Sequence, residues 1–211
     1  MFDALDKLPK ISCLMVTAGG RDSLFLRSFQ QFQDQTYPNK ELVVVNEGPP
    51  EYQQFIRSQI AGHADVKFIA LQGEYTLGAL RNISMLLCNG DIWVQWDDDD
   101  FNVPERLAVQ FSFLLKHPEA KMCYLADQFH YYFNRKQLYW ENWLAFHSGN
   151  TKKWALIPGT GMAWRNQIHH RYPSAGNHAR AGEDSIFAYT LLADDERNVV
   201  LLSGMGYMQA Y

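Results

Sequence analysis

The sequence predicts an α/β fold, with a mostly parallel sheet flanked by helices and a smaller, mixed C-terminal part. Two observations carry this prediction. In the first 118 residues, short apolar runs alternate with longer amphipathic segments, which is typical of parallel strands connected by helices. Beyond that point the alternation is replaced by aromatic-rich segments that favour hairpin strands. Because no low-complexity linker interrupts the chain, we expect one domain over 1–211, with halves at about 10–118 and about 119–211.

Four short apolar runs predict the strands of the first half: residues 10–17, 41–45, 66–71 and 91–96. The first run, KISCLMVT, ends at the turn residues AGG. The second, ELVVV, is rich in β-branched side chains and stops at NEGPP. The fourth runs directly into four aspartates. The strand ends are therefore marked by polar or glycine-rich turns.

Amphipathic segments between these strands predict helices over residues 22–34, 51–60, 77–87 and 104–116. Asp22 is suited to cap the first helix. Asn89 and Gly90 are suited to close the third. In the fourth, Pro104 is expected at the first helical position, with Glu105 in the first turn.

The second half is predicted to contain a hairpin, a broken strand, a helix and two closing strands. The hairpin is expected at residues 122–139 with a turn at 134–136, and the broken strand at 154–164 with its break at Pro158 and Gly159. The helix is expected at 183–192, and the closing strands at 199–202 and 207–211.

Composition excludes several functional classes. With 47% hydrophobic and 20% charged residues the chain is not disordered, and a net charge of −4 gives no global basic field for nucleic acid. The three cysteines form no Cys-x-x-Cys pair, which argues against a disulfide framework and a zinc knuckle. No apolar stretch is long enough to span a bilayer, and the first residues do not match a secretory signal. We therefore expect a cytoplasmic protein without a transmembrane segment, for which peripheral membrane association is still open.

Polar turns follow three of the predicted strands and should gather at the carboxyl edge of the sheet, where such sheets bind ligands. The most charged of them is Asp97-Asp98-Asp99-Asp100. Adjacent carboxylates at the end of a buried strand require a counter-charge, and Mg²⁺ or Mn²⁺ prefers such oxygens. If this segment is extended, Asp97 and Asp99 point the same way. A solvated acidic turn is the alternative interpretation.

Several pieces of this sequence resemble glycosyltransferase family 2, an inverting family with the GT-A fold. They occur in the family's order and together cover about residues 10–190: the first strand with its turn to Arg21, QTYPNKELVVVNEG, LGALRN, GDI through the aspartates to PERL, and GED at 182–184.

This resemblance implies that the chain binds a nucleotide-diphospho-sugar, expected to be a UDP-sugar, through its first half. Asp97 and Asp99 match the family's Asp-x-Asp element, so Asp99 would contact Mn²⁺ or Mg²⁺ and Asp97 would lie near both the metal and the donor ribose. Thr17 and Arg21 match the first nucleotide-contacting turn. Glu47 stands where the family has a base-binding aspartate, and Arg81 matches an arginine near the base or phosphates: these two complete the expected donor site.

The resemblance also implies that Glu183 and Asp184 match an acidic pair beside the acceptor, a saccharide or another molecule with a hydroxyl group. An inverting transfer is a single in-line displacement, so one base removes the acceptor proton, and we expect Asp184 to be that base. Acidic residues in a first helical turn also stabilise the helix dipole, which is the structural alternative.

Two departures from the family pattern keep a second function open. Asn46 occupies a position that is commonly acidic in the family, and Glu47 occupies one that is usually aspartate. In addition, no histidine follows the stretch from Gly206 to Tyr211, where relatives carry a metal ligand. Weak metal affinity is expected from the second departure. The alternative is therefore a transferase-like domain that binds nucleotide or glycan without turnover. A nucleotidyltransferase is disfavoured because no glycine-rich, lysine-bearing loop follows the first strand.

Overall fold

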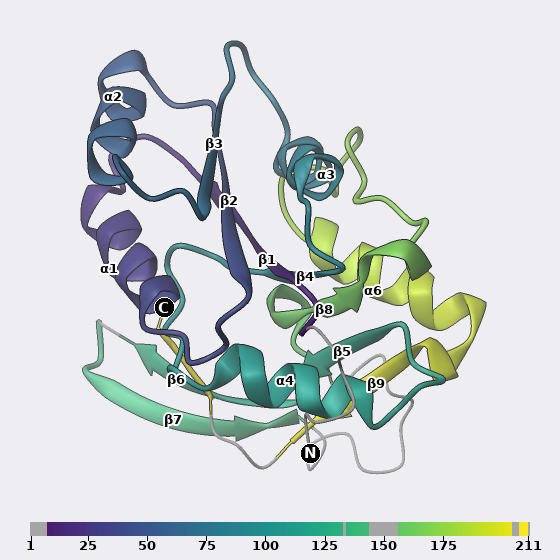
Figure 1. Ribbon diagram of the computed structural model, residues 1–211. Helices are drawn as coiled ribbons and strands as arrows, with labels where there is room; N and C mark the ends of the chain where they lie inside the picture. The colour runs from purple at the N-terminus through teal and green to yellow at the C-terminus, as the bar shows by residue number, and fades with distance from the viewer. Residues whose placement is uncertain (1–7, 133, 144–155, 204–206, 211) are drawn as a thin grey trace.

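The computed structural model describes residues 8–132, 134–143, 156–203 and 207–210. Its main feature is a seven-stranded sheet with the order β3-β2-β1-β4-β8-β5-β9 (Figure 1). The strands are β1 Ile11–Thr17, β2 Lys40–Asn46, β3 Val66–Ala70, β4 Ile92–Gln95, β5 Met122–Leu125, β8 Met162–Trp164 and β9 Val199–Leu202. All neighbouring pairs are parallel except β4–β8 and β5–β8. The predicted mostly parallel α/β fold is therefore confirmed.

Helices follow the strands of the first half as the alternating pattern predicts. The helical segments are α1 Asp22–Gln33, α2 Pro50–Gln59, α3 Leu77–Leu87, α4 Arg106–Leu115 and α6 Glu183–Asp194, with short 3-10 turns η2 Pro158–Thr160, η3 Arg165–Gln167 and η4 Glu196–Asn198. No helix in these described ranges is long and apolar enough to cross a bilayer.

Three predictions about helix termini were wrong. Pro104 is not the first residue of α4, which begins at Arg106 with Glu105 at the cap position; the Pro104 carbonyl instead accepts a hydrogen bond from the Thr36 amide at 2.9 Å. Arg21 occupies the cap position of α1, and Asp22 is already helical. Helix α3 ends in an extended Cys88, without a left-handed glycine cap.

The second half differs more from the prediction. Residues 122–125 belong to the large sheet as β5, and the hairpin is formed only by β6 Asp127–Tyr132 and β7 Gln137–Asn142. These strands join β10 Tyr207–Ala210 in a three-stranded sheet of order β10-β6-β7. The strand expected at 154–164 is shortened to β8, because Pro158 and Gly159 lie in the turn η2; residues 154 and 155 lie outside the described residues.

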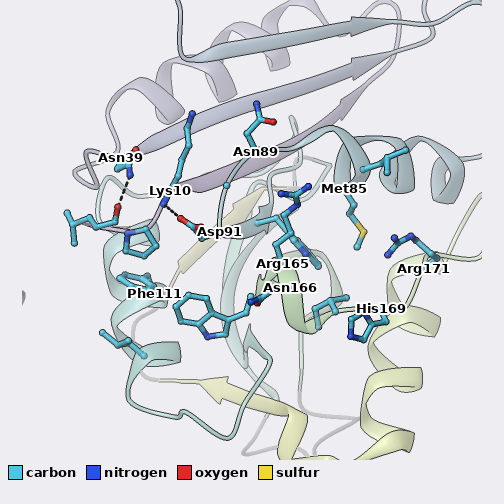
Figure 2. A pocket seen from close by; sticks show the side chains of 18 residues that line it. Lys10, Asn39, Met85, Asn89, Asp91, Phe111, Arg165, Asn166, His169 and Arg171 are labelled. Atoms are coloured by element: carbon cyan, nitrogen blue, oxygen red, sulfur yellow. Dashed lines mark hydrogen bonds between the residues drawn. The ribbon is translucent and has the colours of Figure 1, made fainter. Parts of the chain in front are cut away.

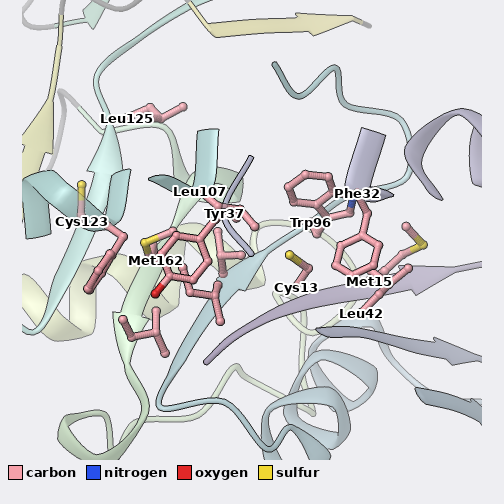
Figure 3. Close-up of a cluster of buried hydrophobic side chains, with 14 of the residues drawn as sticks. Cys13, Met15, Phe32, Tyr37, Leu42, Trp96, Leu107, Cys123, Leu125 and Met162 are labelled. Carbon is pink, nitrogen blue, oxygen red and sulfur yellow. The ribbon is translucent and has the colours of Figure 1, made fainter. Parts of the chain in front are cut away.

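The large sheet is buried on both faces, as parallel sheets usually are. On one face Ile11, Cys13 and Met15 of β1 pack with side chains of α1, α2 and α4 in the cluster of Figure 3. On the other face Leu14 and Val43 pack with side chains of α3 and α6. The alternation of side chains along β1 thus supplies both cores.

The strand order also fixes where a ligand site is expected. Strand β1 pairs with β2 on one side and β4 on the other, so the chain reverses its direction of winding between β1 and β4. In open α/β sheets a crevice forms at the carboxyl ends of the strands at such a point. The turns after β1 and β4 therefore face one another.

Candidate functional site

A pocket of about 350 Å³ lies at the carboxyl edge of β1, β2 and β4. Its walls contain all the residues predicted to bind the donor or the metal, namely Thr17, Arg21, Glu47, Arg81, Asp97 and Asp99. Val16, Ala18, Tyr75, Leu77, Leu80, Asp98 and Arg180 complete the lining. The structure thus brings together predicted site residues that are up to 82 positions apart in the sequence, from Thr17 to Asp99. Glu183 and Asp184 lie behind this lining, on α6.

Asp98 fixes the aspartate loop to the turn after β1. Its carboxylate accepts hydrogen bonds from Thr17 Oγ1 at 2.7 Å, Arg21 Nε at 2.9 Å and Arg21 Nη2 at 2.5 Å. Only 2% of Asp98 is exposed. Burial raises the pKa of Asp98, while the bonds from Arg21 and Thr17 offset part of this rise. Asp98 therefore holds the two turns together and does not face solvent.

Asp99 is more accessible than Asp97 or Asp98: 54% of its side chain is exposed, against 23% for Asp97 and 3% for Asp98. Its Oδ2 accepts a hydrogen bond from Arg21 Nη2 at 2.8 Å. Arg27 Nη2 donates to the Asp99 carbonyl at 2.8 Å and so holds the backbone of the turn. Asp98 and Asp99 lie in a turn, so the expectation of an extended segment was wrong, although Asp97 and Asp99 do line one pocket.

Arg81 is a buried clamp between two carboxylates. Its Nε donates to Glu183 Oε1 at 2.8 Å, and its Nη1 donates to Asp97 Oδ1 at 2.9 Å. Burial alone would lower the pKa of Arg81, but the neighbouring carboxylates outweigh it, and the pKa is raised. Arg81 therefore lines the pocket, yet most of its hydrogen-bonding capacity is committed to Asp97 and Glu183.

Two residues that were not predicted extend this clamp. Gln95, the last residue of β4, donates from Nε2 to Asp97 Oδ2 at 3.3 Å. Tyr172 is buried and donates from its hydroxyl to Gln95 Oε1 at 3.1 Å. A polar glutamine inside the apolar run IWVQW was the available sequence signal for Gln95. Tyr172 lies in a loop and gave no such signal.

Asp184 is the second residue of α6, which follows Gly182 with a φ of 79°. Its Oδ1 accepts a hydrogen bond from the Ser185 amide at 2.7 Å. Burial raises the pKa of Asp184, and the charge of Arg81 lowers it in part. A β-carbon placed on Gly159 would lie 3.3 Å from Asp97 Oδ2 and 4.0 Å from Asp184 Oδ2. The two carboxylates therefore flank the same glycine.

Asn46, the last residue of β2, and Glu47, the first residue after it, lie in different environments. Glu47 faces the pocket, and its Oε2 accepts a hydrogen bond from the Tyr75 amide at 2.7 Å. Asn46 is buried: its Nδ2 donates to the Thr17 carbonyl at 2.7 Å, and its Oδ1 accepts from the Gly48 amide at 2.9 Å. An aspartate could not donate the first of these bonds, so Asn46 is explained by local structure.

The donors present fit a divalent cation only as part of a larger ligand set. Within the described ranges no three His, Cys, Asp or Glu side chains are grouped as a metal site. Asp97 and Asp99 supply carboxylate oxygens to one pocket, and Mg²⁺ or Mn²⁺ is commonly held by one or two carboxylates with phosphate oxygens and water. These two residues would hold such an ion together with a diphosphate.

Comparisons with known proteins confirm the fold. TarS from S. aureus in complex with UDP superimposes with a TM-score of 0.72 and 15% identity, covering 96% of this chain and 60% of that one. The mannosyltransferase PcManGT from Pyrobaculum calidifontis, in complex with GDP-Man and Mn²⁺, superimposes with a TM-score of 0.71 and 13% identity, covering 98% of this chain and 57% of that one. These GT-A structures share the fold of this chain.

Sequence comparisons identify the family. An uncharacterized glycosyltransferase of Haemophilus influenzae is 31% identical over 114 residues, which are 53% of this chain and 42% of that protein. The amylovoran biosynthesis glycosyltransferase AmsE of Erwinia amylovora is 28% identical over 92 residues, which are 43% of this chain and 35% of that protein. The chain thus spans less than half the length of these curated relatives. The family model of glycosyl transferase family 2 matches residues 13–172, which is most of the chain. This chain therefore belongs to glycosyl transferase family 2.

Proposed function

We propose that this chain transfers a sugar, with inversion, from a nucleotide-diphospho-sugar to a hydroxyl of a saccharide or another acceptor, in the presence of Mn²⁺ or Mg²⁺. The observation that carries the proposal is the meeting of Thr17, Glu47, Asp97 and Asp99 in one pocket at the carboxyl edge of the sheet. On this proposal residues 10–118 bind the donor, and residues 119–211 contribute to the acceptor side.

Asp99 and Asp97 would hold the cation against the diphosphate of the donor. The bound ion neutralises the charge that develops as the nucleoside diphosphate leaves. Arg21 already contacts Asp99, so its guanidinium is placed to bind a phosphate oxygen as well. Arg81 and Gln95 keep the Asp97 carboxylate in a fixed orientation. Preorganised groups of this kind stabilise developing charge without reorganising during the reaction.

Asp184 is the proposed base. It flanks Gly159 together with Asp97, so an acceptor hydroxyl lying over this glycine would be close to both the base and the donor site. Burial raises the pKa of Asp184, which makes its carboxylate a stronger base than that of an ordinary aspartate. Glu183 is buried against Arg81 and is therefore proposed to position α6, with no contact to the acceptor.

A UDP-sugar is the proposed donor. One structural neighbour, TarS, has been crystallised with UDP and with UDP-GlcNAc, whereas PcManGT contains GDP-Man and Mn²⁺. In this chain Glu47 lies in the pocket and has its Oε2 bound to the Tyr75 amide. Its carboxylate could accept a hydrogen bond from the imide N–H of uracil. The pocket residues thus support a uridine nucleotide.

Release of nucleoside diphosphate in a panel of UDP- and GDP-sugars with Mn²⁺ tests the proposal. We expect release from at least one UDP-sugar, increased by a saccharide acceptor and abolished by a chelator. Metal-dependent nucleotide binding without release or transfer across the panel would instead favour the alternative, a non-catalytic nucleotide- or glycan-binding domain. Release that is indifferent to chelation would contradict the role of the metal.

A further inference from the structure

A second and larger cavity, of about 1070 Å³, lies at the opposite edge of the sheet from the candidate active site. Lys10 precedes β1, Asp91 precedes β4, and Arg165 follows the antiparallel β8, so all three lie where the amino ends of the parallel strands begin. The backbone here is fixed by hydrogen bonds from the Arg165 amide to the Asp91 carbonyl at 2.9 Å and from the Ile92 amide to the Lys10 carbonyl at 3.1 Å. Strand β1 separates the two cavities by roughly 20 Å.

The cavity carries cationic charge that the described protein does not neutralise. Figure 2 shows Arg165 near the centre of the view, with Arg171 and His169 toward the right and Lys10 and Asp91 toward the left. In the part of the chain that the structure describes, Arg165 and Arg171 form no ion pair with a carboxylate. Lys10, by contrast, is paired with Glu41 at 3.2 Å. Asp91 also lines this cavity, and its carboxylate accepts a hydrogen bond from the Lys10 amide at 2.9 Å. The two exposed guanidinium groups outnumber this carboxylate, which favours an anionic ligand.

The same cavity has an apolar rim. Leu86 at the end of α3 is 69% exposed, and Leu115 at the end of α4 is 41% exposed. Met85 and Ile168 add further apolar side chains to the lining. A ligand that covers this rim must therefore combine a negative charge with an apolar part.

We propose that this cavity docks the protein on the surface of a bilayer that contains anionic phospholipids. Arg165 and Arg171 would bind lipid phosphates, and Leu86 and Leu115 would enter the interfacial region. A soluble phosphorylated metabolite would leave the two leucines in water. A single-stranded nucleic acid would need a row of exposed aromatic platforms, but of the aromatic side chains that line this cavity Trp93 and Phe111 are 1% and 0% exposed, and Trp164 is half-buried.

Cosedimentation with sucrose-loaded vesicles tests the proposal. The protein should bind vesicles of phosphatidylcholine mixed with phosphatidylglycerol at low salt, should bind pure phosphatidylcholine much less, and should be released by high salt. The Arg165→Gln/Arg171→Gln variant should lose roughly fivefold in partition coefficient for each arginine removed. Leu86→Ser should weaken binding without changing its dependence on salt.

The matched control is Arg135→Gln/Arg197→Gln, which removes the same charge from exposed positions that do not line this cavity. It should bind anionic vesicles as the unmodified protein does.

Equal binding to neutral and anionic vesicles, no vesicle binding, or an equal loss in the control would each overturn the proposal. So would saturable binding of glycerol 3-phosphate alone, or concentration-dependent dimerisation that Leu86→Ser abolishes, because these identify a free anion or a second copy as the occupant. The lipid and salt comparisons need no variant, and nucleotide-sugar turnover in solution provides an independent test of the proposed function.

Discussion

Four adjacent aspartates with the same intrinsic chemistry acquire different properties from their partners. Asp97 is clamped by Arg81, Asp98 is buried against Thr17 and Arg21, and Asp99 projects into the pocket. Asp100 is also buried, at 5% exposure. A charge run that would repel itself in isolation is thus stabilised by arginines from α3 and from the turn after β1.

Asp184→Asn should lower turnover by about 10²- to 10⁴-fold, because the amide cannot accept the acceptor proton. Donor binding should be unchanged, since Asp184 does not line the pocket. Asp65→Asn, an exposed aspartate before β3, is the control. Near-normal turnover of Asp184→Asn would remove this residue from the role of base.

The pH dependence of turnover follows from the same residue. A base works only when it is deprotonated, and burial raises the pKa of Asp184 above that of a free aspartate. Activity should therefore fall on acidification at a pH above the ordinary aspartate range of about 4. A pH–rate profile of kcat measures this limb, and an acidic limb at or below the ordinary value would contradict the assignment.

Arg81→Met should destabilise the protein by about 3–5 kcal/mol, because it leaves the buried carboxylate of Glu183 and that of Asp97 without their counter-charge. Urea unfolding followed by circular dichroism measures the loss. Arg57→Met, on the exposed side of α2, is the matched control and should change the free energy of unfolding by less than about 1 kcal/mol. Equal losses in the two variants would show that the clamp contributes no special stability.

At the scale of elements, helix α3 connects the donor pocket to α6. Asn82 forms two hydrogen bonds with the Tyr172 backbone, at 2.8 and 2.9 Å, and the Gly78 amide donates to the Ala179 carbonyl at 3.0 Å. The Tyr172 ring in turn stacks on Phe187 of α6 with centroids 4.4 Å apart. The segment 172–179 therefore joins the helix that bears Arg81 to the helix that bears Asp184.

Gly78→Ala tests this connection. A β-carbon on Gly78 would lie 1.9 Å from the Pro173 carbonyl oxygen, so α3 and the segment 172–179 must separate. Stability should fall by about 1–3 kcal/mol, although alanine is the better helix former. Gln54→Ala on the exposed face of α2 should be neutral or slightly stabilising. A stabilised Gly78→Ala protein in thermal unfolding would contradict the close packing.

The first-half elements were predictable because each has a local signal. Residues 77–87 are helical as the pattern indicates, and β1 and β2 differ from their predicted ranges by one residue or two. The placement of 122–125 in the large sheet was not predictable, because it depends on pairing with β8 and β9, which are far apart in the sequence. Short apolar runs do not specify their partners.

At the scale of the whole molecule, the pocket residues could be predicted because motif and topology both bring the carboxyl ends of β1, β2 and β4 together. Their electrostatic pairing could not. The sequence indicates neither that Arg81 is shared between Asp97 and Glu183 nor that Gln95 and Tyr172 support Asp97. Two of these contacts, Arg81 with Glu183 and Tyr172 with Gln95, cross between the two halves of the chain, and only the folded arrangement determines them.

Calorimetric titration of UDP into the protein, with and without Mn²⁺, measures the central claim most directly, because it reports cation-dependent binding of a diphosphate at the aspartate loop. We expect Mn²⁺ to strengthen UDP binding by at least about tenfold, equivalent to about 1.4 kcal/mol. Asp99→Asn should lose this dependence, whereas Asp65→Asn, an exposed aspartate away from the pocket, should retain it. Equal affinity for UDP with and without Mn²⁺, or an unchanged metal dependence in Asp99→Asn, would contradict the account.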